Sequence, residues 1–425
     1  MANAAAIEKT EKLLQELRVY DGSSSTQAAL IHQLDEIRNS LQQPREIANY
    51  YIKKGLVLII INTCVELGVF DAVLPDTPAS AEDIADKVGV DASILTRFLR
   101  APMVEGFFSL AAPDGNKPQN PPSSPYLYRH TPASLSLRGL PAHTWWRTAL
   151  TLPMSRFWRT PDYIRSHSTA ELQDSRHNAL AWAMGLESEG LTFFEALDRD
   201  KQYAGFWWSA MGMAEYGFGS FPWAKLWEDV SRKQDGRDRV FVVDVGGGRG
   251  KRLVEIIREL GEVKDKEPSL KPMMVLEDLG GVIGGETPVS IEGVKNVVYD
   301  FFQQGAEQPV KGAHVYHLRH VLHDYYDEKA RQILKQVVDA MRPDSRVILC
   351  EYIIPEEHDL GHEIFPYVMD FLLFLAGGLE RTHRQWQQLL DSVGLEIMNI
   401  WPSKDGHPEV DIEACLKDTK PERSL

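Results

Sequence analysis

Three carboxylates and one guanidinium in the second half of the chain follow apolar stretches, at positions where a ligand could be held. Asp244, Asp278 and Asp300 end or follow three of these stretches, and Arg319 follows a fourth. Apolar stretches that alternate with helical patterns predict a parallel sheet, and ligands of such sheets bind at the carboxyl ends of the strands. We therefore expect the four side chains to converge on one crevice.

A glycine-rich turn follows the first of these stretches. Residues 240–255 read VFVVDVGGGRGKRLVE, with a β-branched apolar run before the glycines and a helical pattern after them. Gly246 and Gly248 allow the backbone to approach a ligand closely, and amides at the helix start face whatever binds there. The spacing is neither the dinucleotide fingerprint GxGxxG nor a P-loop that ends in GK[ST]. The pattern indicates a nucleoside-type site, with Asp244 at the end of the strand.

The remaining periodicity predicts the elements that position these residues. The fold class that it indicates is α/β, with a parallel sheet covered by helices on both faces. Strands are expected at residues 240–245, 273–276, 297–299, 313–318 and 346–351. Helices are expected where the helical pattern begins at Leu253, over 326–341 and over 367–376.

The first 140 residues form a mainly helical part, for which two segments are expected. Residues 1–45 carry two helical patterns, the second with an apolar stripe suited to packing on a partner subunit or on its own domain. Residues 46–140 predict three helices followed by two short strands, 107–110 and 126–128, which is a winged-helix arrangement. The helix that would enter a DNA groove offers only Arg97 and Arg100 as cations, so dimerisation is favoured over DNA binding.

Residues 141–230 are helical and rich in aromatic side chains, and residues 231–425 contain the sheet. Most of these aromatic residues are expected in the core, and some are expected to line a pocket for a flat apolar substrate. The candidates for contact with that substrate are His143, Trp208, Met211 and His320.

The bulk composition excludes several classes of protein. The chain has 425 residues and a formal net charge of -15, which disfavours non-specific binding to nucleic acid. Its 3 cysteines are scattered without a CxxC pair, which is typical of a reducing cytoplasm. Neither a signal peptide nor an apolar run long enough to cross a bilayer is expected. No metal site is expected either: structural zinc is disfavoured without a CxxC pair, and the histidines at 314, 317, 320 and 323 straddle a strand and a turn.

Taken together, several motifs resemble those of class I S-adenosylmethionine-dependent O-methyltransferases, specifically the plant caffeic-acid-type and fungal secondary-metabolite enzymes. The resemblance covers roughly residues 50–400. It implies a Rossmann-like catalytic domain behind a winged-helix dimerisation domain, and a homodimer. It rests on the segments VVDVGGGRG (242–250), LEDLGGVI (276–283), VVYDFF (297–302), HLRHVLHDY (317–325) and FLLFLAGGLERT (371–382).

The resemblance implies roles for most of these residues in binding S-adenosylmethionine. Asp278 stands in the ribose-binding place, Asp300 and Phe301 stand beside the adenine, Arg319 stands near the cofactor, and Tyr325 stands in the adenine-stacking place. These roles make physical sense, because a carboxylate can accept two hydroxyl hydrogen bonds from a ribose, and acidic strand ends attract the sulfonium charge.

The resemblance also places His323 as the catalytic base, with Glu380 or Asp370 orienting its ring. An unperturbed histidine titrates near pH 6.5, so a neutral imidazole is expected to take a proton from a phenolic or enolic hydroxyl of a secondary metabolite. A carboxylate that accepts from the other ring nitrogen would hold the tautomer.

Two other functions compete with methyl transfer. Arg319 replaces the lysine of plant members and His320 replaces a tryptophan, and some fungal proteins of this fold are pericyclases that steer dehydration and cycloaddition of a polyketide-derived substrate. In that case Arg319, His320 and His143 would polarise a carbonyl. A winged-helix regulator with a vestigial cofactor domain is the non-enzymatic alternative, which the acidic net charge and the presence of Asp278 and His323 disfavour.

Overall fold

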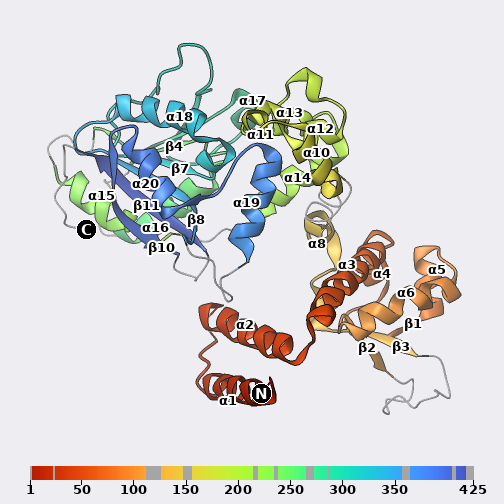
Figure 1. Cartoon of the computed structure of the whole chain (residues 1–425). Helices are drawn as coiled ribbons and strands as arrows, with labels where there is room; N and C mark the ends of the chain where they lie inside the picture. Colours follow the sequence, from red (N-terminus) through yellow and green to blue (C-terminus); the bar gives the residue numbers. More distant parts are fainter. Residues whose placement is uncertain are drawn as a thin grey trace. The chain divides into compact units, whose positions relative to one another are not determined.

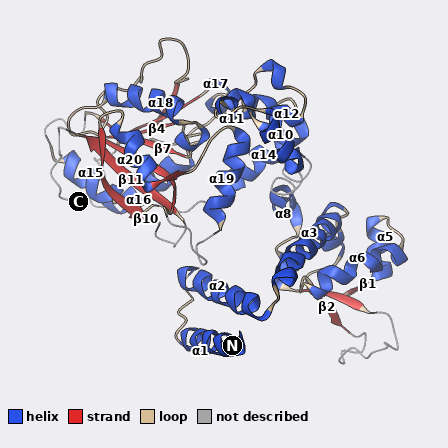
Figure 2. Cartoon of the chain, viewed as in Figure 1, coloured by secondary structure: helices blue, strands red, loops and turns tan. Residues whose placement is uncertain are grey.

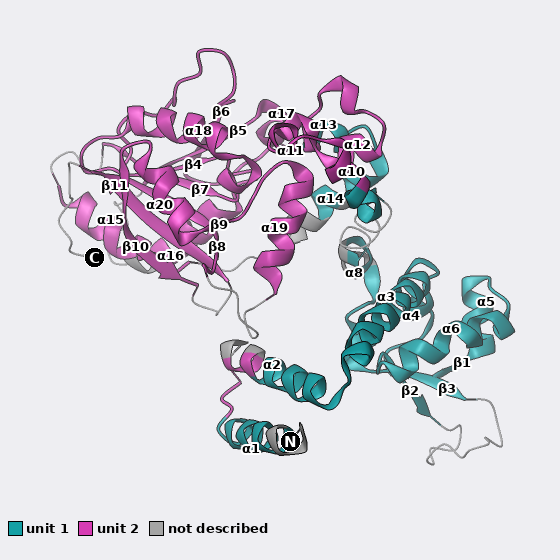
Figure 3. Cartoon of the chain, viewed as in Figure 1, with its two compact units in different colours: residues 1–19, 30–161, 194–215 teal, residues 20–29, 162–193, 216–425 magenta. Residues whose placement is uncertain are grey.

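The computed structural model describes residues 2–22, 24–111, 126–146, 156–213, 219–233, 238–264, 272–285, 288–356, 364–403 and 408–417. The chain divides into two compact units (Figures 1 and 3). Unit 1 comprises residues 1–19, 30–161 and 194–215, and unit 2 comprises residues 20–29, 162–193 and 216–425. Residues 141–230 are thus shared between the two units, and the four-part division expected from the sequence stays a prediction.

Unit 1 contains a small three-stranded sheet and the helices around it. Its sheet is antiparallel, with strand order β1-β3-β2. The elements that lie wholly or mainly in this unit are α1 (Ala2–Arg18), α2 (Ser24–Leu41), α3 (Pro44–Glu66), α4 (Val69–Ala72), β1 (Ala79–Ser80), α5 (Ala81–Val88), α6 (Ala92–Val104), β2 (Phe108–Ala111), β3 (Leu127–His130), α7 (Pro132–Leu135), α8 (Gly139–Trp146), η2 (Phe157–Arg159), α13 (Phe193–Leu197) and α14 (Lys201–Met213).

The winged-helix arrangement predicted for this part is confirmed by helices α3, α5 and α6 and the adjoining hairpin. A capping box starts α5, since the Ser80 side chain accepts from the Asp83 amide and the Asp83 carboxylate accepts from the Ser80 amide. Helix α5 ends at Gly89, which adopts the left-handed conformation with φ 71°. An apolar core that includes Phe70, Leu95 and Phe108 holds the helices and the sheet together.

Unit 2 contains the large sheet. Its strand order is β10-β11-β8-β7-β4-β5-β6, with β9 paired to β8. Its elements are α10 (Thr160–Ser166), α11 (Thr169–Leu172), η3 (Ser175–His177), α12 (Ala179–Ala183), η4 (Glu187–Glu189), α15 (Trp223–Ser231), β4 (Val240–Val245), α16 (Lys251–Lys264), β5 (Met273–Asp278), α17 (Gly280–Ile283), β6 (Val294–Val298), β7 (Val315–Arg319), η5 (Leu322–Asp324), α18 (Asp327–Ala340), β8 (Arg346–Ile354), α19 (Phe365–Ala376), β9 (Arg381–Thr382), α20 (His383–Asp391), β10 (Leu395–Pro402) and β11 (Glu409–Leu416).

The prediction of a parallel sheet holds for β4 to β8 but not for the whole sheet. Strands β4, β5, β6, β7 and β8 are mutually parallel, whereas β11 is antiparallel to both β8 and β10. The sheet is therefore mixed, with an antiparallel pair on one edge, which is common in large α/β sheets. The sequence did not reveal this pair, because β11 carries acidic residues that obscure its apolar pattern: Glu409, Asp411 and Glu413.

Two apolar cores join the sheet to helices that Figure 2 shows in blue beside the red strands. One core joins the strands to α18 and α20 through Leu334, Val337 and Trp386, and the other joins them to α15 and α16 through Trp227 and Ile256. Burial on both faces explains why the central strands are almost uniformly apolar. Within the described parts of the chain, no helix has both the length and the apolar composition needed to cross a membrane.

Candidate active site

The glycine-rich turn after β4 is held open by left-handed backbone and by one carboxylate. Gly246 and Gly248 have φ values of 67° and 60°, which favour glycine strongly. The Asp278 carboxylate accepts from the amides of Gly248 and Leu279, each at 2.7 Å. Burial raises the pKa of Asp278, and these two amide hydrogen bonds oppose that rise. Asp278, one of the four strand-end side chains expected to converge, therefore lies at the glycine-rich turn.

Asp244 supports this turn from below instead of presenting an oxygen to the crevice. The side chain is fully buried, and His317 Nδ1 donates to its Oδ1 at 2.8 Å. Its Oδ2 lies under Gly247, where a Cβ atom would be only 2.4 Å from it. A side chain at position 247 would therefore clash with Asp244, and the negative charge of Asp244 is held directly beneath the turn.

Aromatic side chains close one side of the turn. The rings of Phe302 and Tyr325 pack edge to face at 5.0 Å, and the ring of Phe301 lies 6.1 Å from that of Tyr325. Phe301 also approaches Gly246, where a Cβ atom would lie 3.9 Å from the ring. Burial first, and then the charges of Asp324, Asp278 and Asp300, raise the pKa of the Tyr325 phenol. Phe301 and Tyr325 are thus in contact, and Asp278 and Asp300 lie near enough for their charges to act on the phenol. Contact of these residues with a cofactor stays a prediction.

His323 lies on η5, two residues after a side chain that touches the turn. The side chain that touches the turn is Val321, which lies so close to Gly246 that a Cβ atom there would be 3.0 Å from it. The His323 ring is buried, and its Nδ1 lies 3.0 Å from Glu380 Oε1. Because the carboxylate can only accept, Nδ1 carries the proton and the lone pair of a neutral ring is on Nε2.

The backbone around Glu380 is held equally firmly. Asp370 accepts from the Glu380 amide at 2.9 Å, so it positions the carboxylate and not the imidazole directly. The Leu379 amide donates to the His323 carbonyl at 2.8 Å, and Gly378 packs so closely that a Cβ there would lie 2.2 Å from the same oxygen. Glycine is therefore required beside His323 for steric reasons.

Two further acids surround His323, and the sequence did not reveal their role. Glu351 Oε2 lies 3.5 Å from His323 Nδ1, and Asp324 Oδ1 lies 3.7 Å from Nε2. Glu351 is fully buried, and its Oε1 accepts from the Leu322 amide at 3.1 Å. A single acid within an otherwise apolar strand is the one sequence signal that could have indicated it.

These acids correct the expectation of an unperturbed histidine. Burial alone would lower the pKa of His323, but the charges of Glu351 and Glu380 and the hydrogen bond to Glu380 raise it to about 10. Burial also raises the pKa of Glu351. The charged form of the ring is therefore favoured by these acids, and a base role requires that substrate and cofactor binding lower the pKa of His323.

Arg319 and His320 are engaged with carboxylates of their own. The Arg319 guanidinium lies 3.5 Å from Glu409 and 3.8 Å from Glu255, and His320 Nε2 contacts Glu409 closely. His320 has a φ of 50°, which is a strained backbone conformation for a residue other than glycine. Contact of either residue with cofactor or substrate stays a prediction.

The other substrate candidates belong to unit 1. His143 Nε2 lies 2.9 Å from Asp71 Oδ2, and the half-exposed ring of Trp208 stacks on Phe194 at 5.7 Å. The Met211 side chain is outside the described residues. Their proximity to a substrate stays a prediction.

A Rossmann-like sheet with a glycine-rich turn, an acidic second strand end and a winged-helix domain defines the methyltransferase class. An O-methyltransferase domain matches residues 228–396, and an O-methyltransferase dimerisation domain matches residues 51–137. Demethylsterigmatocystin 6-O-methyltransferase stcP of Emericella nidulans is 36% identical over 162 residues, which are 38% of this chain and 72% of that protein. The chain belongs to the O-methyltransferase family, and it is an enzyme of the methyltransferase type.

Similarity extends over the whole chain in other proteins. O-methyltransferase hmp5 of Hypomyces subiculosus is 28% identical over 421 residues, covering 98% of this chain and 99% of that protein. The solved structure of OxaC with SAH and oxaline has a TM-score of 0.77 at 24% identity, covering 98% of this chain and all of that one. A structure titled as a pericyclic reaction enzyme has a TM-score of 0.75 at 21% identity, covering 97% and 99% of the two chains. These two structures share the fold, which alone does not separate the two chemistries.

Proposed function

We propose that this protein transfers the methyl group of S-adenosylmethionine to a phenolic or enolic hydroxyl of a small aromatic or polyketide-derived molecule, with His323 as general base. The observation that carries the proposal is the buried His323–Glu380 pair at 3.0 Å, on the segment that also touches the glycine-rich turn and bears Tyr325. The membership of the chain in the O-methyltransferase family supports the same reaction.

The residues at the turn fit S-adenosylmethionine. Left-handed glycines expose the backbone of the turn, Asp278 offers carboxylate oxygens to the ribose hydroxyls, and Phe301 and Tyr325 offer faces or edges to the adenine. Asp300 is exposed and would accept from the adenine amino group. When bound, the cofactor supplies an electrophilic methyl group on a positively charged sulfur.

The acids around His323 raise its pKa, so the ring becomes a base only when cofactor and substrate are both bound and lower that pKa again. A sulfonium cation near the imidazolium would disfavour the charged ring, and so would the exclusion of water by substrate. Both effects lower the pKa of His323 from its raised value. Nδ1 then keeps its proton toward Glu380, and Nε2 receives the proton of the acceptor hydroxyl.

The test is incubation of the full chain with S-adenosylmethionine labelled in the methyl group and a panel of phenolic and enolic acceptors. A labelled product formed together with S-adenosylhomocysteine supports the proposal. Consumption of an acceptor without labelled product, at saturating cofactor, contradicts it.

The second candidate is a pericyclase, which the similarity to the pericyclic reaction enzyme favours. That chemistry needs a donor aimed at a carbonyl, yet the expected donors are already paired: Arg319 and His320 with Glu409, and His143 with Asp71. Methyl transfer is therefore the better-supported function. A cyclised, unlabelled product in the assay above would reverse that order.

Glu351→Gln is expected to move the pH profile of methyl transfer to lower pH by about one unit or more. The negative charge of Glu351 raises the pKa of His323, so its removal makes the neutral ring available at lower pH. Glutamine keeps an oxygen for the Leu322 amide, so the local backbone is preserved. The measurement is kcat/KM against pH, with the exposed Glu328→Gln as the matched control. Superimposable profiles for wild type and Glu351→Gln would show that Glu351 does not tune the base.

We also propose that the chain functions as a homodimer through the apolar residues exposed on α3. Tyr51, Ile52, Leu56 and Ile59 are each at least 50% exposed, and the dimerisation domain begins at residue 51. Leu56→Asp is expected to convert a dimer to a monomer in light scattering. Val104→Asp, at a 78% exposed position on α6, should leave the mass unchanged. A monomeric wild-type chain would contradict the proposal.

A further inference from the structure

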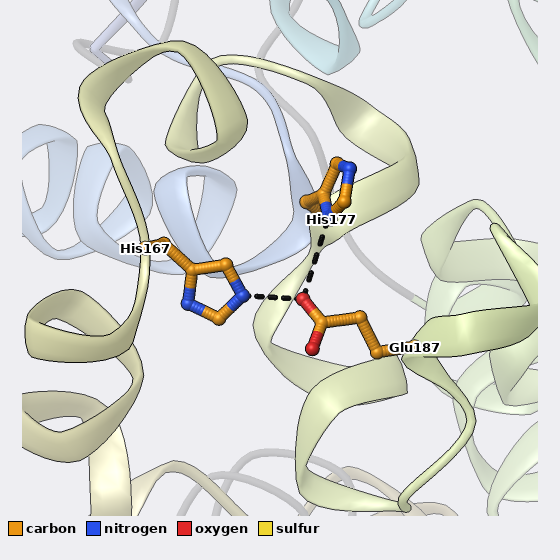
Figure 4. A group of neighbouring side chains, drawn as sticks. All are labelled: His167, His177 and Glu187. Atoms are coloured by element: carbon orange, nitrogen blue, oxygen red, sulfur yellow. Dashed lines mark hydrogen bonds and ion pairs between the residues drawn. The ribbon is translucent and has the colours of Figure 1, made fainter.

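A second cluster of titratable side chains lies in unit 2, in the short helices between residues 160 and 191. His167 follows α10, His177 ends η3 and Glu187 begins η4, so the three residues are spaced ten apart along the chain. Figure 4 shows both imidazoles directed at one carboxylate oxygen of Glu187. His167 Nε2 contacts Glu187 Oε1 closely, and His177 Nδ1 lies 3.4 Å from the same atom. The methyltransferase site uses none of these residues.

The tautomer of His167 is set by its other nitrogen. His167 Nδ1 lies 2.7 Å from the Tyr163 carbonyl oxygen, which can only accept, so Nδ1 carries the proton. In a neutral ring, Nε2 therefore presents a lone pair to a carboxylate oxygen. Two hydrogen-bond acceptors repel each other, so a proton or a metal cation must lie between them. Histidine ligands of metal ions have this arrangement, with the distal N–H donating to a backbone carbonyl.

One buried tyrosine positions both histidines. The Tyr163 hydroxyl donates to the His177 carbonyl, while the Tyr163 carbonyl accepts from His167. The tyrosine is only 1% exposed, and the His167 side chain is 6% exposed. Glu187 and His177 are more open, at 28% and 36%, so an ion could enter from solvent. The cluster is thus supported on its inner side and accessible on its outer side.

We propose that His167, His177 and Glu187 bind a Zn²⁺ ion. One ligand atom from each residue lies within 4.8 Å of the others, so small rotations of the side chains bring all three to bonding distance. Two imidazole nitrogens and one carboxylate oxygen suit Zn²⁺, which is held at about 2.0–2.2 Å by such atoms and prefers four ligands. The fourth position is left to water or to the second oxygen of Glu187.

The ion would stabilise the helical segment that packs against α19, the helix that precedes Glu380. Tyr163 packs against Phe374 of α19 with ring centroids 6.3 Å apart, and α12 also contacts α19. At the end of α19, a Cβ on Gly377 would lie 2.7 Å from Ser175 Cα, so the backbone of η3 touches the turn that leads to Glu380. Zinc at this cluster would therefore stabilise the segment that supports α19 and the turn leading to Glu380, without taking part in the reaction.

The experiment is a titration of the full chain, previously dialysed against a chelator, with Zn²⁺ in competition with a chromogenic chelator. We expect one ion per chain and a rise in Tm of a few degrees at saturating Zn²⁺. Replacement of the ion by Co²⁺ should produce the visible absorption of a four-coordinate site. No saturable binding at one ion per chain would overturn the proposal, because a proton would then suffice between His167 and Glu187.

Variants assign the ion to the cluster. His177→Ala and Glu187→Gln are expected to weaken Zn²⁺ binding by at least about a hundredfold, whereas His177→Cys, which still offers a ligand atom, should retain it. The exposed His383→Ala is the matched control and should bind as the wild type does. His323→Ala tests the other group of suitable side chains, His320, His323 and Glu351. Zinc binding that survives His177→Ala but is lost in His323→Ala would also overturn the proposal.

Discussion

His323→Ala is expected to lower the turnover of methyl transfer by about 10²–10⁴-fold while S-adenosylmethionine still binds. The substitution removes the imidazole that Glu380 holds, so the acceptor hydroxyl loses the group that receives its proton. The backbone should persist, because the His323 carbonyl still accepts from the Leu379 amide. Cofactor affinity should change little, since the predicted cofactor contacts come from the glycine-rich turn, Asp278 and Tyr325.

The measurement is single-turnover transfer of labelled methyl alongside calorimetric titration with S-adenosylhomocysteine. His383→Ala, at an exposed position on α20, serves as the matched histidine control. His323→Ala also leaves Glu351, Glu380 and Asp324 without their cation, so its unfolding must be followed by circular dichroism at each pH used. A variant that is folded and as active as the wild type would remove His323 from the mechanism. Loss of cofactor affinity at unchanged turnover would assign His323 a structural role.

Asp278→Asn is expected to weaken S-adenosylmethionine binding by about a hundredfold or more. Hydrogen bonds to a charged group contribute about 1.5–3 kcal/mol each, and the two ribose hydroxyls would lose a common carboxylate. The negative charge that attracts the sulfonium nucleoside is lost as well. Asparagine keeps the shape and one carbonyl oxygen, which can still accept from the Gly248 or Leu279 amide, so the turn should remain folded.

The measurement for this variant is the cofactor Kd from calorimetry and KM from the transfer assay. Turnover at saturating cofactor should fall far less than affinity, because Asp278 is not placed at the reacting atoms. Asp339→Asn, on the solvent side of α18, is the control for a lost surface charge. An unchanged Kd for Asp278→Asn would mean that the ribose is held elsewhere.

These two predictions depend on parts of the molecule that were predictable to different degrees. The turn between β4 and α16 was predicted correctly because everything that specifies it is local: an apolar β-branched run, glycines where φ is positive, and a helical pattern afterwards. The position of Asp278 beside this turn followed from a general rule, that parallel strands present their carboxyl ends at one edge. Both inferences need only sequence order and periodicity.

The electrostatics of the base were not predictable in this way. Glu351 and Glu380 are separated from His323 by 28 and 57 residues along the chain, and only the packing of β8 and the segment after α19 brings them to the imidazole. In a buried site the charges of such neighbours outweigh the intrinsic pKa of the ring. The sequence could therefore not show that these acids raise the pKa of His323, and the role of His323 as base stays a prediction.

The sequence by itself determined the α/β class, the glycine-rich turn, the strand-end acids and the winged helix, because each of these follows from local pattern or spacing. The family was indicated by the resemblance of its motifs to those of known O-methyltransferases. The tertiary structure alone decided that Asp244 lies beneath the turn, that β11 joins the sheet antiparallel, that Glu351 raises the pKa of His323, and that His167, His177 and Glu187 meet. The physical reason is the same in each case. Burial and charge act through space over a few ångströms, and which residues come within that range is fixed by how the elements pack.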